Sequence, residues 1–337
     1  MAANAPRRQP TLDEVAEHAG VSRSVASRAL NNAPHVSRAK REAVERAVRQ
    51  LGYVPDPTAR ALATRQTGAA ALVVSGEDPS IFADPFFARV IVGASAALEE
   101  ADLHLMLCLA ASDRGRKRVA ELLRSRGADG VMLMALREDD PLTRMAKEAR
   151  MPVVFGGRPV GSVPRWYVDV DNVGGARAAT EHLVSRGRTR VAALCGRLDT
   201  EAGRARYRGY RDGMLAAGLE PLPPWEGDFT EPSGAAAMAA LLARHPDVDG
   251  VFAASDNMAA GALRTLRTAG RRVPGDVAVV GFDDLAVAQI ADPPLTTVQQ
   301  PIEALGREMA RMLLALVDGQ DPTPLLLPTR LVLRSSA

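Results

Sequence analysis

The sequence predicts an α/β protein with an N-terminal helix-turn-helix head and a two-lobed body of parallel sheets flanked by helices. Three short amphipathic helical patterns occupy the first fifty or so residues. From Ala69 onward, short apolar runs alternate with amphipathic stretches, as in a parallel sheet covered by helices. Residues 127–133 (GADGVML) are echoed at 247–253 (DVDGVFA), which predicts two lobes of similar build rather than one large sheet.

The head begins with a capping-box pattern, in which Thr11 caps a helix and Glu14 reaches back to the start of that helix. Gly20 ends this first helix, and a second short helix is expected over residues 23–30. The short glycine-containing turn between them is typical of a helix-turn-helix. A third helix with an apolar stripe is predicted over residues 37–51.

The outward face of the second helix distinguishes a DNA-reading head from a generic three-helix bundle. Its serine and arginine side chains are of the types that bind base edges and phosphates, and the first residues of a recognition helix enter the major groove. Residues 1–65 carry a net charge of +5, whereas the remainder carries −3, which favours a polyanionic partner for the head. The candidate DNA contacts are Thr11, Ser22, Arg23, Ser24, Ser27, Arg28 and Asn31.

Residues 11–16 (TLDEVA), 19–22 (AGVS) and 27–31 (SRALN) together resemble the DNA-binding head of the lactose-repressor (LacI/GalR) family. Residues 51–62 (LGYVPDPTARAL) resemble the linker of that family. Two positions depart from the usual pattern: Val25-Ala26 replaces Thr-Val, and Asp56 replaces Asn. Neither change breaks the expected fold, but both can shift operator preference.

The linker is expected to be a second DNA-reading element. Asp56 is suited to cap a short helix over residues 58–64, which is too short to be stable alone in water. The resemblance implies that this helix folds when two copies pair over the DNA minor groove. Leu62 would then wedge between base pairs, and Ala59 would let the two helices touch. A flexible tether is the alternative.

The body resembles the periplasmic-binding-protein-like core of the same family, notably at residues 203–210, 255–261, 273–277, 281–283 and 294–298. Strands are expected in seven apolar runs: Ala70–Val74, Leu103–Leu109, Gly130–Met134, Pro152–Phe155, Arg190–Leu194, Gly250–Ala254 and Val277–Gly281. The expected domains are a head (1–53), a linker (54–67) and an effector-binding and dimerisation body (68–337), with lobe 1 at about 68–168 and 300–322 and lobe 2 at about 169–297 and 323–337.

Ligands of open parallel sheets collect at the carboxyl ends of the strands. The segments that follow the predicted strands there supply Phe86 and Phe87, residues 156–158, residues 199–206, Ser255-Asp256 and Asp283. Aromatic faces beside arginine and aspartate side chains suit a sugar, whose CH patches stack on rings and whose hydroxyls form hydrogen bonds. A small sugar or related metabolite is therefore the expected effector.

The resemblance implies that Arg206 and Asp283 hydrogen-bond the effector and that Phe229 stacks on it. Phe86, Ser255 and Gln300 are further candidates for effector contact. Several residues also have a purely structural interpretation. Phe86 can belong to the core of its lobe, Asp256 can be a cap or a brace between strands, and Asp171-Asn172 can brace the crossover between lobes.

Other classes of protein fit less well. The five histidines show no paired metal-ligand spacing, no serine lies in a GxSxG elbow, and no GxGxxG occurs, so no enzyme activity, metal or cofactor is expected. No apolar run approaches the roughly 18 residues of a membrane span, and the N-terminus lacks an apolar signal core, so a cytoplasmic location is expected. A nucleoside or protein co-effector and a solute-binding protein remain the alternatives.

The expected mechanism is that of a homodimeric repressor on a palindromic double-stranded operator. Two recognition helices would enter successive major grooves, roughly 34 Å apart. Closure of the lobes on the effector would shift the first lobes of the dimer and unpair the linker helices. Whether the effector releases DNA or tightens its binding is left open by the sequence.

Overall fold

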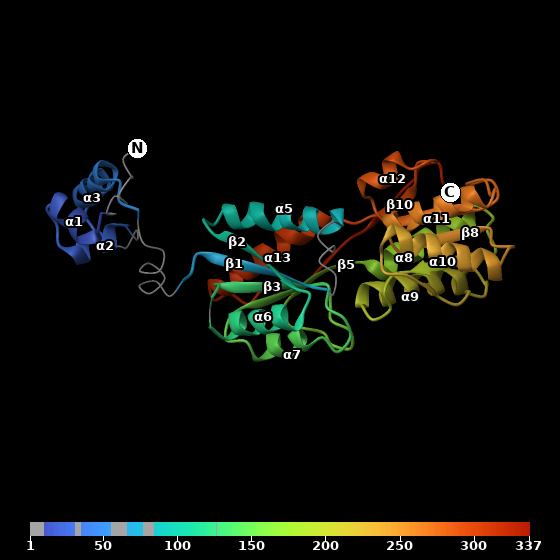
Figure 1. Ribbon diagram of the computed structural model, residues 1–337, viewed down its shortest axis with the longest axis horizontal. Coiled ribbons are helices and arrows are strands. Elements are labelled where there is room, and N and C mark those ends of the chain that lie inside the picture. Colours follow the sequence, from blue (N-terminus) through green and yellow to red (C-terminus); the bar gives the residue numbers. More distant parts are fainter. Residues whose placement is uncertain (1–9, 31–34, 55–65, 77–83, 126) are drawn as a thin grey trace, which may run out of the picture. The chain divides into compact units, whose positions relative to one another are not determined.

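The computed structural model describes residues 10–30, 35–54, 66–76, 84–125 and 127–337 (Figure 1). The chain divides into two compact units, Met1–Gly68 and Ala69–Ala337. Ala59 and Leu62 of the expected linker helix, and Asn31 of the head, lie outside the described residues. The three predicted helices of the head are present: α1 (Leu12–His18), α2 (Arg23–Leu30) and α3 (Arg38–Leu51).

The predicted capping box forms at the start of α1. The Thr11 amide donates to Glu14 Oε2 at 2.6 Å, and the Glu14 amide donates to Thr11 Oγ1 at 3.4 Å. Gly20, in the turn between α1 and α2, has a φ of 65°, a left-handed conformation that glycine adopts without strain. The core of the head consists of small apolar side chains from all three helices: Val15, Ala16, Ala26, Ala29, Val44 and Ala47.

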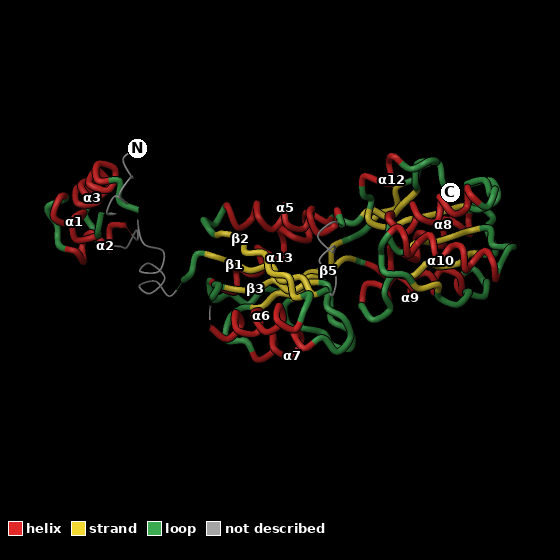
Figure 2. Tube along the Cα trace, viewed as in Figure 1, coloured by secondary structure: helices red, strands yellow, loops and turns green. Residues whose placement is uncertain are grey.

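The first lobe of the body contains a six-stranded parallel sheet of order β11-β5-β4-β3-β1-β2. Figure 2 shows its strands layered between helices. The strands are β1 (Ala69–Ser75), β2 (His104–Ala110), β3 (Gly130–Met134), β4 (Val153–Gly156), β5 (Tyr167–Val170) and β11 (Leu325–Leu327).

Two pairs of helices cover the faces of this sheet. Helices α5 (Pro85–Glu99) and α13 (Ile302–Val317) pack on one face, and α6 (Asp113–Ser125) and α7 (Pro141–Glu148) pack on the other (Figure 1). The backbones of α5 and α13 approach closely, since a Cβ built on Gly93 would lie 1.9 Å from the carbonyl oxygen of Glu303. Each face thus buries a core of its own.

The second lobe repeats this design with a sheet of order β12-β10-β9-β8-β6-β7, in which only β12 runs antiparallel to its neighbour. Helices α8 (Asn172–Ser185) and α9 (Glu201–Ala216) cover one face, and α10 (Glu231–Arg244) and α11 (Asp256–Thr268) cover the other. The remaining elements are β6 (Val191–Cys195), β7 (Trp225–Glu226), β8 (Gly250–Ala253), β9 (Ala278–Asp283), α12 (Ala286–Ile290), β10 (Thr296–Gln299) and β12 (Arg330–Val332).

The division of the chain between the lobes differs from the expectation in the C-terminal tail. Strand β5 pairs within the first sheet and ends this part of the lobe at Val170, close to the expected boundary at about residue 168. The tail expected wholly in the second lobe is split, because β11 pairs with β5 in the first sheet and β12 with β10 in the second. These strands have three or four residues, too few to produce a recognisable apolar run.

Within the described residues, the chain crosses between the lobes three times, at residues 170–172, 299–302 and 327–330. All three crossovers adjoin strands at one edge of each sheet, β5 and β11 in the first and β10 and β12 in the second. In the part of the chain that the structure describes, no helix combines the length and apolar character needed to cross a membrane.

Candidate effector site and DNA-binding face

Arg206 lies at the centre of a buried polar network in the second lobe. It projects from α9 and is almost completely buried. Its Nε donates to Asn172 Oδ1 at 2.9 Å, and its Nη1 donates to the Ala254 carbonyl at 2.5 Å and to Asp283 Oδ1 at 3.1 Å. Among the described residues these bonds engage only Nε and Nη1, which fixes the plane of the guanidinium.

Asp283 stands at the carboxyl end of β9, the position at which the sequence predicted a ligand-facing residue. Gln300 Nε2 donates to Asp283 Oδ1 at 2.5 Å, so this oxygen is shared between Gln300 and Arg206. Burial raises the pKa of Asp283, and the Arg206 charge offsets part of the rise. Burial likewise lowers the pKa of Arg206, and Asp283 opposes that change. The pair is thus costly to desolvate and depends on both partners.

Aromatic rings flank the guanidinium of Arg206. Its Cζ lies 3.8 Å from the centroid of the Phe282 ring and 5.9 Å from that of Phe229. Phe229 has a φ of 70°, a conformation rare for a non-glycine residue and frequently found at functional sites. A Cβ on Gly196 would lie 2.0 Å from Phe229 Cζ, so only glycine leaves room for the ring at this place.

The first lobe contributes Asp84 and Phe86 to the same region. Asp84 caps α5 by accepting a hydrogen bond from the Phe86 amide at 3.0 Å. Burial raises the pKa of Asp84, while hydrogen bonds from the Phe86 amide and the Asn257 side chain and the charge of Arg206 lower it. Because Asn257 and Arg206 belong to the second lobe, these interactions of Asp84 link the two lobes. Phe86 is half-buried and packs edge-to-face on Phe87, with ring centroids 5.1 Å apart.

Ser255 and Asp256 form hydrogen bonds that hold neighbouring segments of the site in place. Ser255 Oγ accepts from the Met258 amide at 3.2 Å, which caps α11, and donates to the Phe229 carbonyl at 3.1 Å. Asp256 accepts from the Leu285 amide at 2.7 Å and from the Thr297 hydroxyl at 2.5 Å. Burial, followed by the charge of Asp283, raises the pKa of Asp256. The bracing role considered for Asp256 is therefore what the structure shows.

Asn172 joins the crossover between the lobes to the site. Its Nδ2 donates to Asp169 Oδ1 and to the Val170 carbonyl, both at 3.2 Å, while its Oδ1 accepts from Arg206. Asp169 also accepts from Arg158 Nε at 2.9 Å. The buried amide side chain of Asn172 thus links the end of β5, where the chain leaves the first lobe, to Arg206.

The exposed face of α2 carries most of the DNA contacts expected from the sequence. Ser22, Arg23, Ser24 and Arg28 are exposed, and Ser27 is half-buried. Arg28 Nε donates to the Ser24 carbonyl at 3.2 Å, and Arg23 Nε lies 3.5 Å from Asp13 Oδ1. Both arginines thus retain exposed guanidinium groups for an anionic partner.

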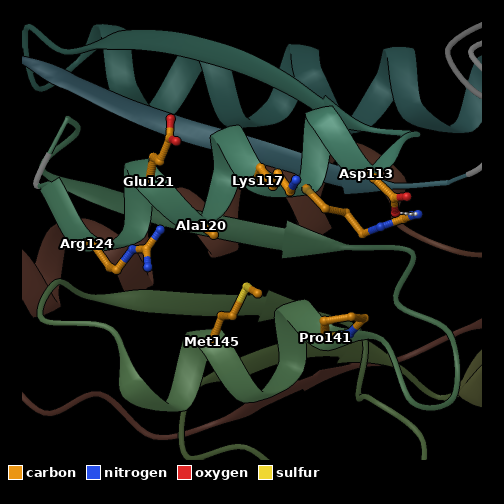
Figure 3. Close-up of a pocket in the computed structure, with 8 residues that line it drawn as sticks. Asp113, Lys117, Ala120, Glu121, Arg124, Pro141 and Met145 are labelled. Carbon is orange, nitrogen blue, oxygen red and sulfur yellow. Dashed lines mark hydrogen bonds and ion pairs between the residues drawn. The ribbon is translucent and has the colours of Figure 1, made fainter.

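A separate hollow of about 520 Å³ lies on the first lobe between α6 and α7 (Figure 3). Met145 and Pro141 of α7 and Ala120 of α6 form its apolar part, and Lys117 and Arg124 lie along α6 beside it. The hollow shares no residue with the network around Arg206. Across the described ranges, no group of three or more His, Cys, Asp or Glu side chains is arranged to hold a metal ion.

Two sequence families cover most of the described chain. Residues 11–56 match the bacterial regulatory proteins of the lacI family, and residues 180–337 match a periplasmic binding protein-like domain. The HTH-type transcriptional regulator CelR of Thermobifida fusca is 49% identical over 338 residues, which cover 98% of this chain and 99% of CelR. This chain belongs to the lacI family.

Further members of the lacI family agree with this placement. The ribose operon repressor of Escherichia coli K12 is 33% identical over 88% of this chain and 89% of its own length. A CelR–cellobiose complex has a TM-score of 0.77 at 47% identity, covering 98% of this chain and 100% of that one. A lac repressor dimer bound to operator and the anti-inducer ONPF has a TM-score of 0.85 at 28% identity, covering 98% and 99%.

Family membership confirms the resemblance and the fold class predicted from the sequence, and the chain is a DNA-binding transcriptional regulator. The interaction between Asp84 and Asn257, which belong to different lobes, was not predicted from the sequence, and Asn172 was expected only to brace the crossover. Asp84 does not directly follow the apolar run of β1, because residues 77–83 lie between that strand and Asp84. Its position in the sequence therefore did not identify it as a residue at the end of a strand. The Asp-Pro pair at residues 84–85 was the one available signal, since it is typical of a helix start.

Proposed function

We propose that this protein is a sequence-specific repressor whose operator affinity is controlled by a small sugar bound between its two lobes. The observation that most supports this function is the buried Arg206–Asp283–Gln300 network beside the Phe229 ring. Such a network offers donors and acceptors in fixed directions for hydroxyl groups, and the ring offers a face for CH groups. Phe86 and Ser255 complete the proposed set of effector-site residues.

A β-linked glucose disaccharide is the first candidate for the effector. The relative CelR has been solved as a complex with cellobiose, and the chain in that structure is 47% identical to this one. Cellobiose presents equatorial hydroxyls around two flat CH faces, and these match the hydrogen-bonding network and the aromatic ring described above. A nucleoside or a protein co-effector is a different outcome of the same binding tests.

The proposed DNA contacts lie in the head and the linker. Ser22, Arg23, Ser24, Ser27 and Arg28 would bind base edges and phosphates in the major groove, and Thr11 and Asn31 are further proposed contacts. We propose that Ala59 and Leu62 act in the minor groove, Leu62 as the wedge and Ala59 as the contact between paired linker helices. A solute-binding protein would account for the body but not for this head.

A homodimer on a palindromic operator accords with these roles. Apolar side chains are exposed on the outer strand of the first sheet and on the helix beside it: Leu107 of β2 is 48% exposed and Val92 of α5 is 59% exposed. A second copy of the chain would cover them. We further propose that the protein acts in the cytoplasm, where operator DNA is found, and that it has no enzyme activity.

Selection of genomic DNA fragments by the purified protein tests this function. The selection is performed at physiological salt, with and without cellobiose and with a pool of other sugars and nucleosides. A palindromic consensus whose enrichment changes with one sugar would support the proposal. If no sequence were enriched, the repressor function would be refuted. A consensus that responds only to a nucleoside would refute the sugar.

A further inference from the structure

The loop that follows β3 in the first lobe contacts the start of α9 in the second. The backbone amide of Glu138 donates to the carbonyl of Asp199 at 2.6 Å. Arg204 Nη2 forms a short ion pair with Glu138 Oε2. A backbone bond and a charged pair thus join the lobes at one point, outside the network around Arg206.

Further contacts fix Arg204 and Asp199, the two second-lobe residues of this junction. Arg204 Nε donates to the Leu198 carbonyl at 2.6 Å, which orients its guanidinium. Arg197 donates to both carboxylate oxygens of Asp199, at 3.0 and 2.7 Å, and Arg137 of the first lobe lies 3.9 Å from Asp199. The hydrogen bond from Arg197 lowers the pKa of the Asp199 carboxyl.

The junction lies away from the strands through which the chain crosses between the lobes. Strand β3 is two positions from β5 in its sheet, and β6 is three positions from β10 in the other. With a strand spacing of about 4.8 Å, the junction is on the order of 10–14 Å from the crossover strands. Opening about the crossovers would therefore separate Glu138 from Arg204, whereas the crossover strands themselves would move little.

We propose that Glu138 and Arg204 are positioning residues that form a latch between the two lobes, on the side away from the crossovers. The Glu138–Arg204 latch favours the closed arrangement of the lobes. Because α9 carries both Arg204 and Arg206, closing the latch also sets the position of the effector-site arginine. Given the proposed function, the latch slows effector dissociation and contributes to the coupling between effector and operator.

The amide hydrogen of Glu138 reports directly on this latch, since its acceptor belongs to the other lobe. The test is hydrogen exchange of the full-length protein without sugar, resolved to the Glu138 amide by NMR or overlapping short peptides. The pair is exposed, with 40% and 47% of the two side chains accessible, so replacing Arg204→Gln should accelerate this exchange about two- to fivefold. Arg204→Lys should restore most of the protection.

Arg208→Gln is the matched control, because Arg208 pairs with Glu201 at 2.9 Å within α9 and should leave Glu138 exchange unchanged. Glu138→Gln provides a second variant should Arg204→Gln fail to fold. An unprotected Glu138 amide in the wild type, or equal exchange in wild type and Arg204→Gln, would overturn the latch. Because the exchange experiment contains no sugar, its result does not depend on whether the protein binds cellobiose.

A second measurement addresses the effect on the effector. In stopped-flow binding with cellobiose as the probe, Arg204→Gln should dissociate about two- to fivefold faster than wild type, and Arg208→Gln should not. An unchanged dissociation rate in Arg204→Gln, with faster exchange at Glu138, would overturn the claim that the latch retains the effector.

Discussion

Replacing Gly196→Ala is predicted to displace the Phe229 ring from the effector site. The new Cβ would lie 2.0 Å from Phe229 Cζ, whereas ordinary contact begins at 3.4 Å, so the ring must retreat by about 1.4 Å. Full burial of a phenylalanine side chain is worth about 1.5–3 kcal/mol. If the ring no longer covers the sugar, Kd should rise on the order of 10- to 150-fold. Isothermal titration with cellobiose measures this change directly.

Gly275→Ala is the matched control for this experiment. Its Cβ would lie 3.5 Å from the Arg272 side chain, an ordinary contact, and effector affinity should remain that of the wild type. Thermal unfolding of each variant verifies that the second lobe is intact. A folded Gly196→Ala variant that binds cellobiose within twofold of wild type would refute the role of Phe229 as the stacking face.

Four further predictions follow from the site and the head. Arg206→Ala should abolish the response to effector and lower the free energy of unfolding by about 3–5 kcal/mol, because the Asp283 carboxylate is left buried without its partner. Burial raises the pKa of Asp283, and protonation removes the unpaired charge, so the loss of stability measured by denaturation should be smaller at pH 5.5 than at pH 8. Arg28→Ala should weaken operator binding and flatten its salt dependence in anisotropy titrations, without altering effector affinity. Leu62→Ala should weaken operator binding while calorimetry shows unchanged effector binding; equal DNA affinity would contradict the minor-groove wedge. Cys195, whose pKa burial raises to about 12, should resist iodoacetamide at pH 8 until the protein is unfolded.

The sequence predicted the elements whose local patterns are strong. The Thr11–Glu14 capping box needs only two side chains three residues apart, and it forms as expected. The buried apolar runs of β1, β3, β6, β8 and β9 are long enough to stand out, and each is a strand. Helix α2 likewise exposes Arg23, Ser24 and Arg28 and leaves Ser27 half-buried, because its alanines fill the core.

What the sequence could not provide depends on contacts between distant segments. Strands β11 and β12 exist through pairing with β5 and β10, and their own residues carry no distinctive period. The Asp84–Asn257 contact and the Glu138–Arg204 pair join residues 173 and 66 positions apart, in different lobes. Nothing local distinguishes these polar and charged side chains from those of an ordinary solvated surface.

Ser255 illustrates a residue whose type was informative but whose role was ambiguous. A serine after a strand suits either a ligand hydroxyl contact or a helix cap. In the structure its hydroxyl is used by the α11 cap and by the Phe229 carbonyl. Through the second bond it supports the backbone of Phe229, so a Ser255→Ala variant would act on the effector through that ring.

Operator titration with and without saturating cellobiose tests the central claim most directly. Labelled DNA carrying the selected palindrome is titrated with full-length protein at physiological salt, and calorimetry on the same preparation verifies that the sugar is bound. A coupling of about 1–3 kcal/mol predicts a 5- to 150-fold change in operator Kd, as a weakening if the sugar is an inducer. An unchanged operator Kd with the sugar bound would contradict effector control of DNA binding.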